Sequence, residues 1–215
     1  MRNNLYKKIA IGTTQFGMKY GIANKNGQVK KDEVSQILDF AQRQGINTID
    51  TAKVYGSSEE TIGNYINDYH DTYWEIITKV NKEGEDIEAQ IDDSIDKLNT
   101  APYAVLAHSA SDYLDPVFCK ELHQLKNTKE IQKIGVSVYT IKEIKKVLSI
   151  KPPDIIQCPL NILDNKLYRK NILDEIKGHG IDIHIRSVFL QGLFYLSKED
   201  IKISFPDALR TLEQL

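Results

Sequence analysis

The feature that most constrains the fold of this chain is a regular alternation of short apolar runs with amphipathic helical segments. In the helical segments, apolar residues recur at three- and four-residue spacing, as Ile87, Ile91 and Leu98 do. A helix between every two strands makes neighbouring strands parallel, since a parallel connection needs a crossover. The runs predicted to form strands are 8–11, 46–49, 74–78, 103–107, 131–136, 154–157 and 181–185.

Helix starts are signalled by capping residues. Asp32 is predicted to cap the first long helix, and Ser57 with Glu60 three residues later predicts a capping box. Asp115 followed by Pro116 predicts an N-cap with proline at the first helical position. Another helix is expected to begin within 205–215, after the last predicted strand.

A doubly wound open sheet and a TIM barrel both fit this alternation. Seven strand-helix units followed by the start of a further helix favour a (β/α)8 TIM barrel that is incomplete, with about seven β/α units present and the eighth missing. No Pro/Gly/Ser-rich linker or low-complexity tract interrupts the chain, so a single domain over 1–215 is expected.

The composition of the chain limits which kinds of partner the protein can be expected to bind. The 215 residues carry 28 basic and 30 acidic side chains, a net charge of -2, which gives no electrostatic footprint for nucleic acid. No apolar run reaches the roughly 18 residues of a membrane span, and the first nine residues lack the apolar stretch of a signal peptide. Cys119 and Cys158 are isolated, as in proteins of a reducing compartment. We therefore expect a cytoplasmic protein without nucleic-acid or membrane partners.

Four polar residues stand at or just beyond the ends of predicted strands: Asp50, Tyr55, Lys79 and His108. In a parallel barrel the carboxyl ends of the strands meet at one edge, which is where chemistry is done. A lone phenol is a poor acid at neutral pH, with a reference pKa of about 10. A neighbouring ammonium favours the phenolate, and a carboxylate can hold that ammonium in place. Such a set could polarise a carbonyl group and protonate the alkoxide formed when hydride arrives.

Each of the four also has a purely structural interpretation. Asp50 could cap a turn, and Tyr55 could be a half-buried aromatic. Lys79 could be a solvated strand end, while His108 could bond to backbone. Their shared position at one predicted edge favours a site.

The sequence resembles the aldo-keto reductase family in a collinear series of segments that covers essentially the whole chain. By this resemblance Asp50, Tyr55, Lys79 and His108 would form a catalytic tetrad, with Tyr55 the proton donor. The family uses NADPH, less often NADH, bound extended across the carboxyl edge of the barrel. The segments are IGTTQFG (11–17), DTAKVYGSSEETIG (50–63), ITKV (77–80), VLAHS (105–109), IGVSVY (134–139), IIQCPLNILD (155–164) and RSVFLQGL (186–193).

The resemblance also implies which residues would bind the cofactor. Ser137 and Gln157 match positions that hydrogen-bond the nicotinamide carboxamide, and both side chains can donate and accept. Val138 replaces the asparagine common after that serine. Arg186 stands where many members place an aromatic that stacks on nicotinamide, and Ser187 follows it in the same cofactor-binding set.

The implied function is NAD(P)H-dependent reduction of an aldehyde or ketone, with a small-molecule carbonyl substrate of a sugar-related kind. Two alternatives stay open: a catalytically weak or inactive binding or regulatory protein on this scaffold, and a phosphate-ligand isomerase or lyase. Against the last, the stretch 187–192 holds one glycine. The histidines lack zinc-site spacing, so no metal is expected.

In that family the last strand and the loop into its final helix carry the basic and polar residues that bind the adenosine 2'-phosphate and adenine. This sequence has no counterpart to that segment. The chain is therefore expected to be a fragment or a natural truncation with a compromised cofactor site, unless another chain covers the gap. Nothing in the sequence specifies an oligomeric state.

Overall fold

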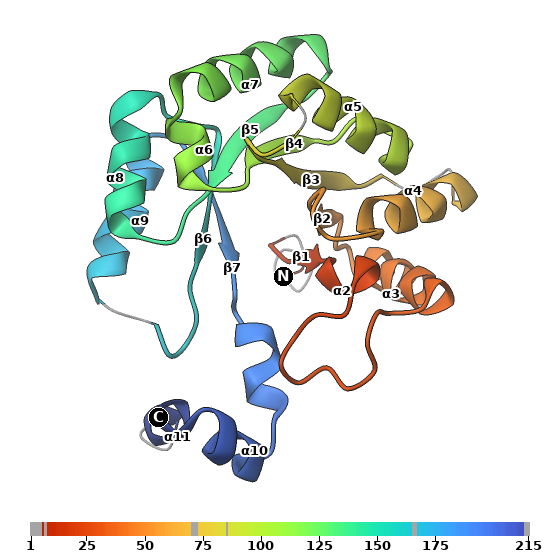
Figure 1. Ribbon diagram of the computed structural model, residues 1–215, viewed down its shortest axis with the longest axis vertical. Coiled ribbons are helices and arrows are strands. Elements are labelled where there is room, and N and C mark those ends of the chain that lie inside the picture. The colour runs from red at the N-terminus through yellow and green to blue at the C-terminus, as the bar shows by residue number, and fades with distance from the viewer. Residues whose placement is uncertain (1–5, 7, 70–72, 85, 165–166, 213–215) are drawn as a thin grey trace.

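Seven parallel strands form one sheet, and the long helices between them lie along its outer side (Figure 1). The computed structural model describes residues 6, 8–69, 73–84, 86–164 and 167–212. The strands pair in chain order and are β1 (Ala10–Gly12), β2 (Thr48–Asp50), β3 (Glu75–Val80), β4 (Ala104–Ala107), β5 (Lys133–Ser137), β6 (Ile155–Pro159) and β7 (Asp182–Arg186). The predicted seven-stranded parallel α/β sheet is confirmed.

A helical segment follows every strand, as the alternation predicts. The helices between strands are α2 (Thr14–Gly17), α3 (Lys31–Arg43), α4 (Ser58–Asp68), α5 (Ile87–Leu98), α6 (Ala110–Leu114), α7 (Pro116–Thr128), α8 (Ile141–Ile150) and α9 (Leu167–Gly178). After β7 come the 3-10 helix η1 (Leu190–Tyr195) and the helices α10 (Lys198–Ser204) and α11 (Pro206–Leu212).

The sheet curls, so each strand has an inward and an outward face. Ile77, Leu106 and Ile155, on three different strands, form one small buried cluster with Ala104 on the inner side. Side chains alternate along a strand, so the residue two positions further on also points inward. The inner face is therefore apolar at mid-strand, and it becomes polar at the carboxyl edge two residues later.

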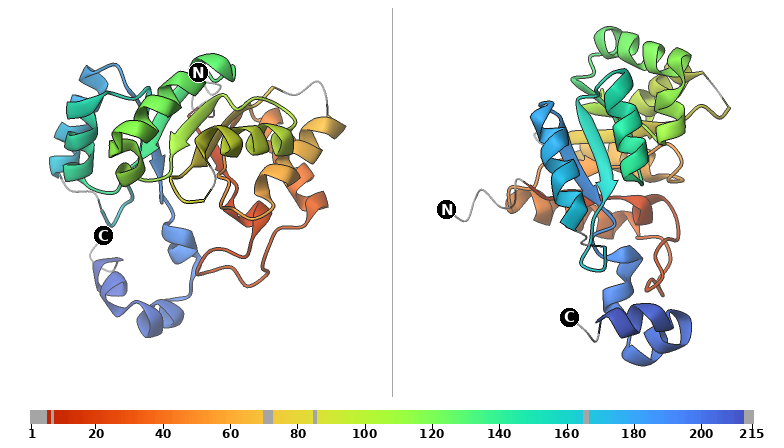
Figure 2. Two further views of the ribbon diagram at one scale, coloured as in Figure 1. Left: turned by 45° about the horizontal axis from the view of Figure 1, so that its top comes forward. Right: turned by 90° about the vertical axis from the view of Figure 1, so that its left-hand side faces the viewer.

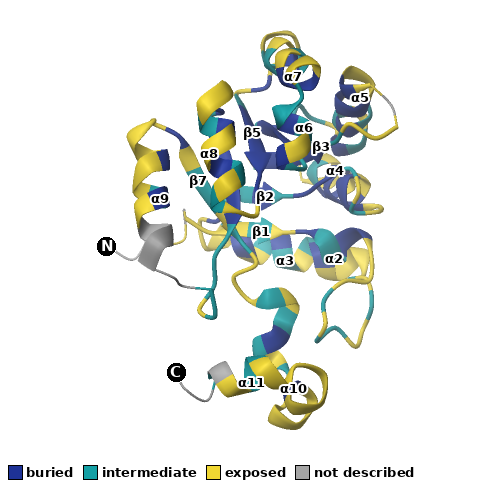
Figure 3. Cartoon of the chain, turned by 60° about the vertical axis from the view of Figure 1, so that its left-hand side comes forward, coloured by how far each residue is buried: buried dark blue, intermediate teal, exposed yellow. Residues whose placement is uncertain are grey.

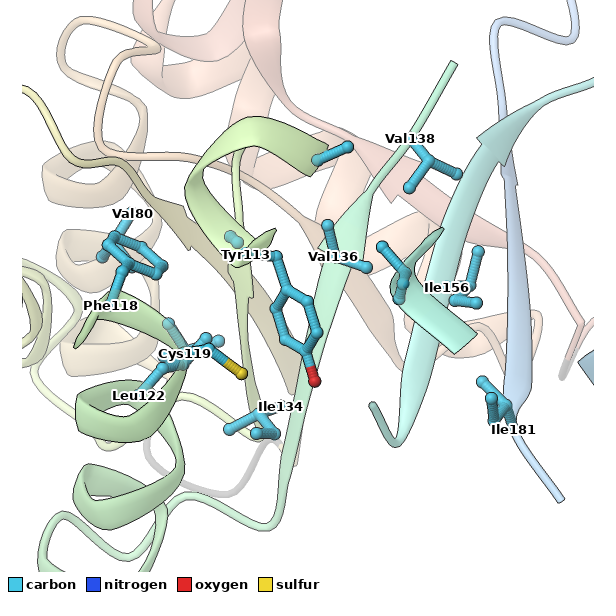
Figure 4. Close-up of a cluster of buried hydrophobic side chains, with 14 of the residues drawn as sticks. Val80, Tyr113, Phe118, Cys119, Leu122, Ile134, Val136, Val138, Ile156 and Ile181 are labelled. Carbon is cyan, nitrogen blue, oxygen red and sulfur yellow. The ribbon is translucent and has the colours of Figure 1, made fainter. Parts of the chain in front are cut away.

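The outward faces pack under the helices in two larger clusters. One joins β3 to β7 with α5 to α9, and Figure 4 shows Tyr113, Cys119 and Val136 among its members. The other joins α3 and α4 to β2 and β3 around Leu38, Ile49 and Ile62. Figure 3 shows the same division, with buried strands inside and exposed outer helix faces.

One predicted N-cap residue and one predicted capping box are wrong, although both helices form. Lys30, and not Asp32, is the N-cap of α3, because the helix begins one residue before Asp32. Ser57 is the N-cap of α4 but makes no capping hydrogen bond. Its hydroxyl lies 3.0 Å from Gln28 Nε2, which donates to it from the loop between α2 and α3. By contrast Asp115 caps α7 with Pro116 in its first turn, as predicted.

The helices after β7 extend away from the sheet (Figure 2). The helix expected within 205–215 is present as α11 over Pro206–Leu212, and α10 precedes it. The last three residues of the expected range, 213–215, lie outside the described part of the chain. Among the described helices, none is both long and apolar enough to cross a membrane.

Candidate active site

The four candidate catalytic residues lie at the carboxyl edge of three adjacent strands. Asp50 is the last residue of β2, and Lys79 is the penultimate residue of β3. His108 follows β4 directly, and its backbone N–H donates to Val80 O at 2.8 Å. Tyr55 lies in the turn between β2 and α4. The parallel register of β2, β3 and β4 brings these positions to one place.

Lys79 and Asp50 form a buried ion pair. Lys79 Nζ donates to Asp50 Oδ1 at 2.8 Å and to Oδ2 at 2.9 Å, and its third bond reaches Thr51 O at 2.7 Å. An ammonium has three N–H groups, so these three contacts use its donor capacity. The Lys79 side chain is 2% exposed and that of Asp50 is 19% exposed. The ammonium is thus fixed in position at the inner face of the sheet.

Tyr55 is held beside this pair by a close contact between two backbone segments. Lys79 Nζ lies 5.2 Å from the centroid of the Tyr55 ring, within reach of a cation–π interaction. A Cβ on Gly17 would lie 1.7 Å from Tyr55 O, and Gly56 has φ +59 against the carbonyl of Gly17. Only glycines allow this approach. The IGTTQFG and VYG segments therefore fit together through their glycines.

A cluster of three buried hydroxyl groups fixes the backbone around Asp50. Thr13 donates to Asp50 O through both its backbone N and its Oγ1, each at 3.0 Å. Ser58 Oγ lies 2.8 Å from Thr13 Oγ1 and 3.0 Å from Thr51 Oγ1. Thr13, Thr51 and Ser58 are all 0% exposed. Sequence reasoning missed this cluster, although Thr13, Thr51 and Ser58 all lie in the segments 11–17 and 50–63 that carry the family resemblance.

His108 completes the group as a neutral ring. Its centroid is 6.2 Å from that of Tyr55, with the two rings perpendicular. Burial, and next the charge of Lys79, lower the pKa of His108 below its ordinary value. The Nδ1 atom is buried without a partner among the described residues. At neutral pH the ring can therefore donate or accept one hydrogen bond without carrying a charge.

Gln157, which sequence reasoning assigns to the cofactor side, lies against the ion pair. Its Nε2 donates to Asp50 Oδ1 at 2.8 Å, and its Oε1 is buried without a partner among the described residues. His184 sits beside it on β7 in the strand register. Burial lowers the pKa of His184, and Asp50 partly opposes that shift.

The other three candidate cofactor residues form a second group. Arg186 Nε donates to Ser137 Oγ, and its Nη1 donates to Ser187 Oγ, both at 3.3 Å. Its guanidinium carbon lies 4.0 Å from the ring centroid of Tyr139. Ser187 has φ +61, a left-handed backbone that turns the chain sharply after β7. The structure thus joins Ser137, Arg186 and Ser187 by side-chain hydrogen bonds. Gln157 is the register partner of Ser137 on the neighbouring strand β6, and its side chain donates to Asp50 instead.

Tyr20 is a further aromatic residue that was not predicted for the site. Burial raises the pKa of Tyr20, with further contributions from Tyr55 and Tyr139, while Arg186 opposes the shift. No sequence signal distinguishes it, because it belongs to an irregular loop.

Comparison with known proteins gives one consistent family. The model of the Aldo/keto reductase family matches residues 8–213. D-arabinose 1-dehydrogenase from Saccharomyces cerevisiae is 30% identical over 176 residues, which are 67% of this chain and 51% of that protein. The chain thus spans about half the length of this curated relative.

Two solved structures show the same fold. Glycerol dehydrogenase from Gluconobacter oxydans has a TM-score of 0.71 at 24% identity, covering 93% of this chain and 67% of that chain. An aldo-keto reductase from Bombyx mori in complex with NADP has a TM-score of 0.66 at 22% identity, covering 84% and 62%. At these identities the likeness is one of fold.

Proposed function

The chain belongs to the aldo/keto reductase family, and on this premise we propose that it catalyses the NAD(P)H-dependent reduction of an aldehyde or ketone to an alcohol. The observation that carries the proposal is the buried Lys79–Asp50 pair beside the ring of Tyr55, with His108 next to it. This is the arrangement that a proton donor to an alkoxide requires. In this proposal all four residues are catalytic.

Tyr55 delivers the proton in the proposed reaction. The Lys79 ammonium stabilises negative charge on the phenol oxygen as its proton leaves, and Asp50 keeps the ammonium in place. His108, neutral at physiological pH, donates a hydrogen bond to the carbonyl oxygen and orients it toward Tyr55. The cofactor, when bound, supplies the hydride.

The described residues fit a nicotinamide cofactor. Gln157 Oε1 is a buried acceptor that has no hydrogen-bond partner in the described part of the chain, which suits the N–H of a carboxamide. The Ser137 hydroxyl, next to the Arg186 guanidinium, lies on the strand adjacent to Gln157. Ser137, Gln157, Arg186 and Ser187 would hold NADPH, or NADH, at this edge. The Bombyx mori relative is in complex with NADP, which favours the phosphorylated form.

The substrate in our proposal is a small carbonyl compound related to sugars and polyols. D-arabinose 1-dehydrogenase and glycerol dehydrogenase, two similar proteins, carry names of that chemical class. The seven described strands correspond in this proposal to the first seven units of an eight-unit barrel, and they form a single domain. Their order β1 to β7 and their curl support this correspondence.

Two measurements test the proposed function. NADPH fluorescence titrated with the protein should show micromolar binding, and small aldoses and aldehydes should then accelerate NADPH oxidation. Tyr55→Phe should abolish the carbonyl-dependent oxidation and leave NADPH binding in place. Tyr73→Phe is the matched control, because Tyr73 is 62% exposed and precedes β3, at the opposite end of the strand from Lys79. Binding without turnover in the wild type would instead support the regulatory alternative.

A further inference from the structure

A side-chain hydrogen bond joins Gln157 to Asp50 across the inner face of the curled sheet. Gln157 Nε2 donates to Asp50 Oδ1 at 2.8 Å, between residues 107 positions apart. Gln157 is on β6 and Asp50 on β2, and β3, β4 and β5 lie between them in the sheet. The bond therefore does not belong to the pairing of neighbouring strands. It links two distant parts of the inner face.

The direction of this hydrogen bond follows from its chemistry. Gln157 is 3% exposed, so water contributes little to its bonding. A reversed amide would set its oxygen against an oxygen of Asp50, and both atoms are acceptors when the carboxylate is ionised. The amide nitrogen therefore faces Asp50. The Gln157 oxygen then points away from the pair as a buried acceptor.

Through Asp50 this contact reaches the ammonium of Lys79. Asp50 Oδ1 accepts from both Gln157 and Lys79, and Oδ2 accepts from Lys79 alone among the described residues. Without the Gln157 donor, Asp50 would keep its hydrogen bonds to Lys79. It would lose the hydrogen bond from Gln157, which fixes the orientation of the Asp50 carboxylate. Lys79 lies 5.2 Å from the ring centroid of Tyr55, so a shift of the pair would move the charge relative to the phenol.

We propose that Gln157 is a positioning residue for the Asp50–Lys79 pair, a role separate from any contact with the cofactor. The role rests on the proposed function, because the position of the pair matters to turnover only if Lys79 and Tyr55 transfer a proton. A residue that contacts the cofactor alone would leave Asp50 undisturbed when changed. The two roles therefore predict different behaviour of variants.

Two substitutions of the same residue separate these roles. Gln157→Met removes the donor to Asp50 at every pH. Gln157→Glu keeps the shape and an acceptor for a carboxamide, but sets a carboxylate against Asp50. Two carboxyl groups at hydrogen-bond distance share one proton at lower pH, and the protonated group then donates to its neighbour. Acid should therefore restore the missing hydrogen bond in the glutamate variant alone.

We expect both variants to lose kcat, and we expect acid to restore kcat in Gln157→Glu alone. At pH 8 both variants should show a kcat reduced about 10- to 100-fold, the effect of losing one hydrogen bond to a charged group. As the pH falls to 5.5, kcat of Gln157→Glu should recover relative to Gln157→Met. The other ionisable residues near position 157 are the same in both variants, so the ratio of the two kcat values isolates the change of side chain at that position. These residues are Tyr55, His108, His184 and Arg186, together with Lys79 of the pair itself.

A second readout needs neither cofactor nor turnover. In Gln157→Glu the shared proton raises a carboxyl pKa in the folded state above its unfolded value, so the stability it contributes is lost as pH rises. The melting temperature of Gln157→Glu should therefore fall relative to that of Gln157→Met between pH 5 and pH 8. In an Asp50→Asn background this pH dependence should shrink, because only one carboxyl group remains.

These outcomes are distinguishable from failure of the proposed function. A wild-type protein that reduces no carbonyl compound contradicts the proposed function, while the melting series still tests the contact. The positioning role is overturned if the two variants melt with the same pH dependence. It is also overturned if both lose NADPH affinity with kcat unchanged at every pH.

Discussion

Lys79 Nζ lies 2.8 Å from Asp50 Oδ1 and 2.9 Å from Asp50 Oδ2, so a nearly fully buried ammonium is paired with one carboxylate at the end of the adjacent strand. Removing one partner of a buried pair leaves the other charge uncompensated. This relationship therefore bears on stability as well as on catalysis, and double substitution can separate the two.

Asp50→Asn should destabilise the protein by about 3 kcal/mol, because Lys79 stays buried without its anionic partner. Adding Lys79→Met should recover most of that loss, since no charge is then buried. Carbonyl reduction should remain absent in the double variant. Urea denaturation gives the stabilities, and additive losses in the double variant would contradict the paired-charge interpretation.

Gly17→Ala should destabilise the fold by at least about 2 kcal/mol, because the new Cβ would overlap Tyr55 O and Ser58 N. The clash would also displace the turn that carries Tyr55. Gly178→Ala is the control, since nothing lies within 4 Å of a Cβ there. Denaturant midpoints of the two variants measure the difference, and equal midpoints would argue against the close approach.

Ser58→Ala should cost about 1–3 kcal/mol, because the buried hydroxyls of Thr13 and Thr51 each lose a hydrogen-bond partner. kcat should fall as well, since this cluster fixes the backbone of Asp50. Ser149→Ala serves as a comparison, because Ser149 is exposed and its hydroxyl donates to Lys146 O within its own helix. Its stability should change by less than about 0.5 kcal/mol.

Acid should destabilise the protein partly through His123. Burial, followed by the charge of Lys151, lowers the pKa of His123 to about 4. The pKa of His123 in the unfolded chain is about 6.5. At a pH between about 4 and 6.5 the imidazole is therefore protonated in the unfolded chain and neutral in the folded protein. Stability from this group is therefore complete above pH 6.5 and is lost as pH falls toward 4.

His123→Gln removes that titration and keeps a polar side chain opposite Tyr113, whose hydroxyl lies 3.2 Å from His123 Nε2. Melting temperatures of the wild type and variant should converge, or cross, as the pH falls from 7.5 to 4.5. A constant difference across that range would show that His123 takes no part in acid unfolding.

Much of the fold could be predicted because a strict strand-helix alternation leaves few arrangements open. All seven strands form where apolar runs predict them, with most ending one or two residues later, because the last inward-facing residue is polar. Asp50 and Lys79 are such residues, and hydrophobicity alone does not reveal that they belong to a strand. The short helices α2 and α6 were missed because neither contains a full period of apolar residues.

The candidate site was predictable as a set of positions but not as a set of contacts. Strand ends in a parallel sheet meet by topology, which places Asp50, Lys79 and His108 together. The bond from Gln157 to Asp50 depends on the curl of the sheet, which no local pattern encodes. The missing capping hydrogen bond of Ser57 has a similar cause, since Gln28, distant in the sequence, donates to the Ser57 hydroxyl.

The most direct test of carbonyl reduction by this protein traces the hydride from NADPH to the product. The protein is incubated with glyceraldehyde and NADPH carrying deuterium at both C4 positions, and the alcohol product is examined by mass spectrometry and NMR. We predict one deuterium on the former carbonyl carbon, in product that the wild type forms and Tyr55→Phe does not. Alcohol without deuterium at that carbon, or equal product from Tyr55→Phe, would contradict hydride transfer with Tyr55 as proton donor.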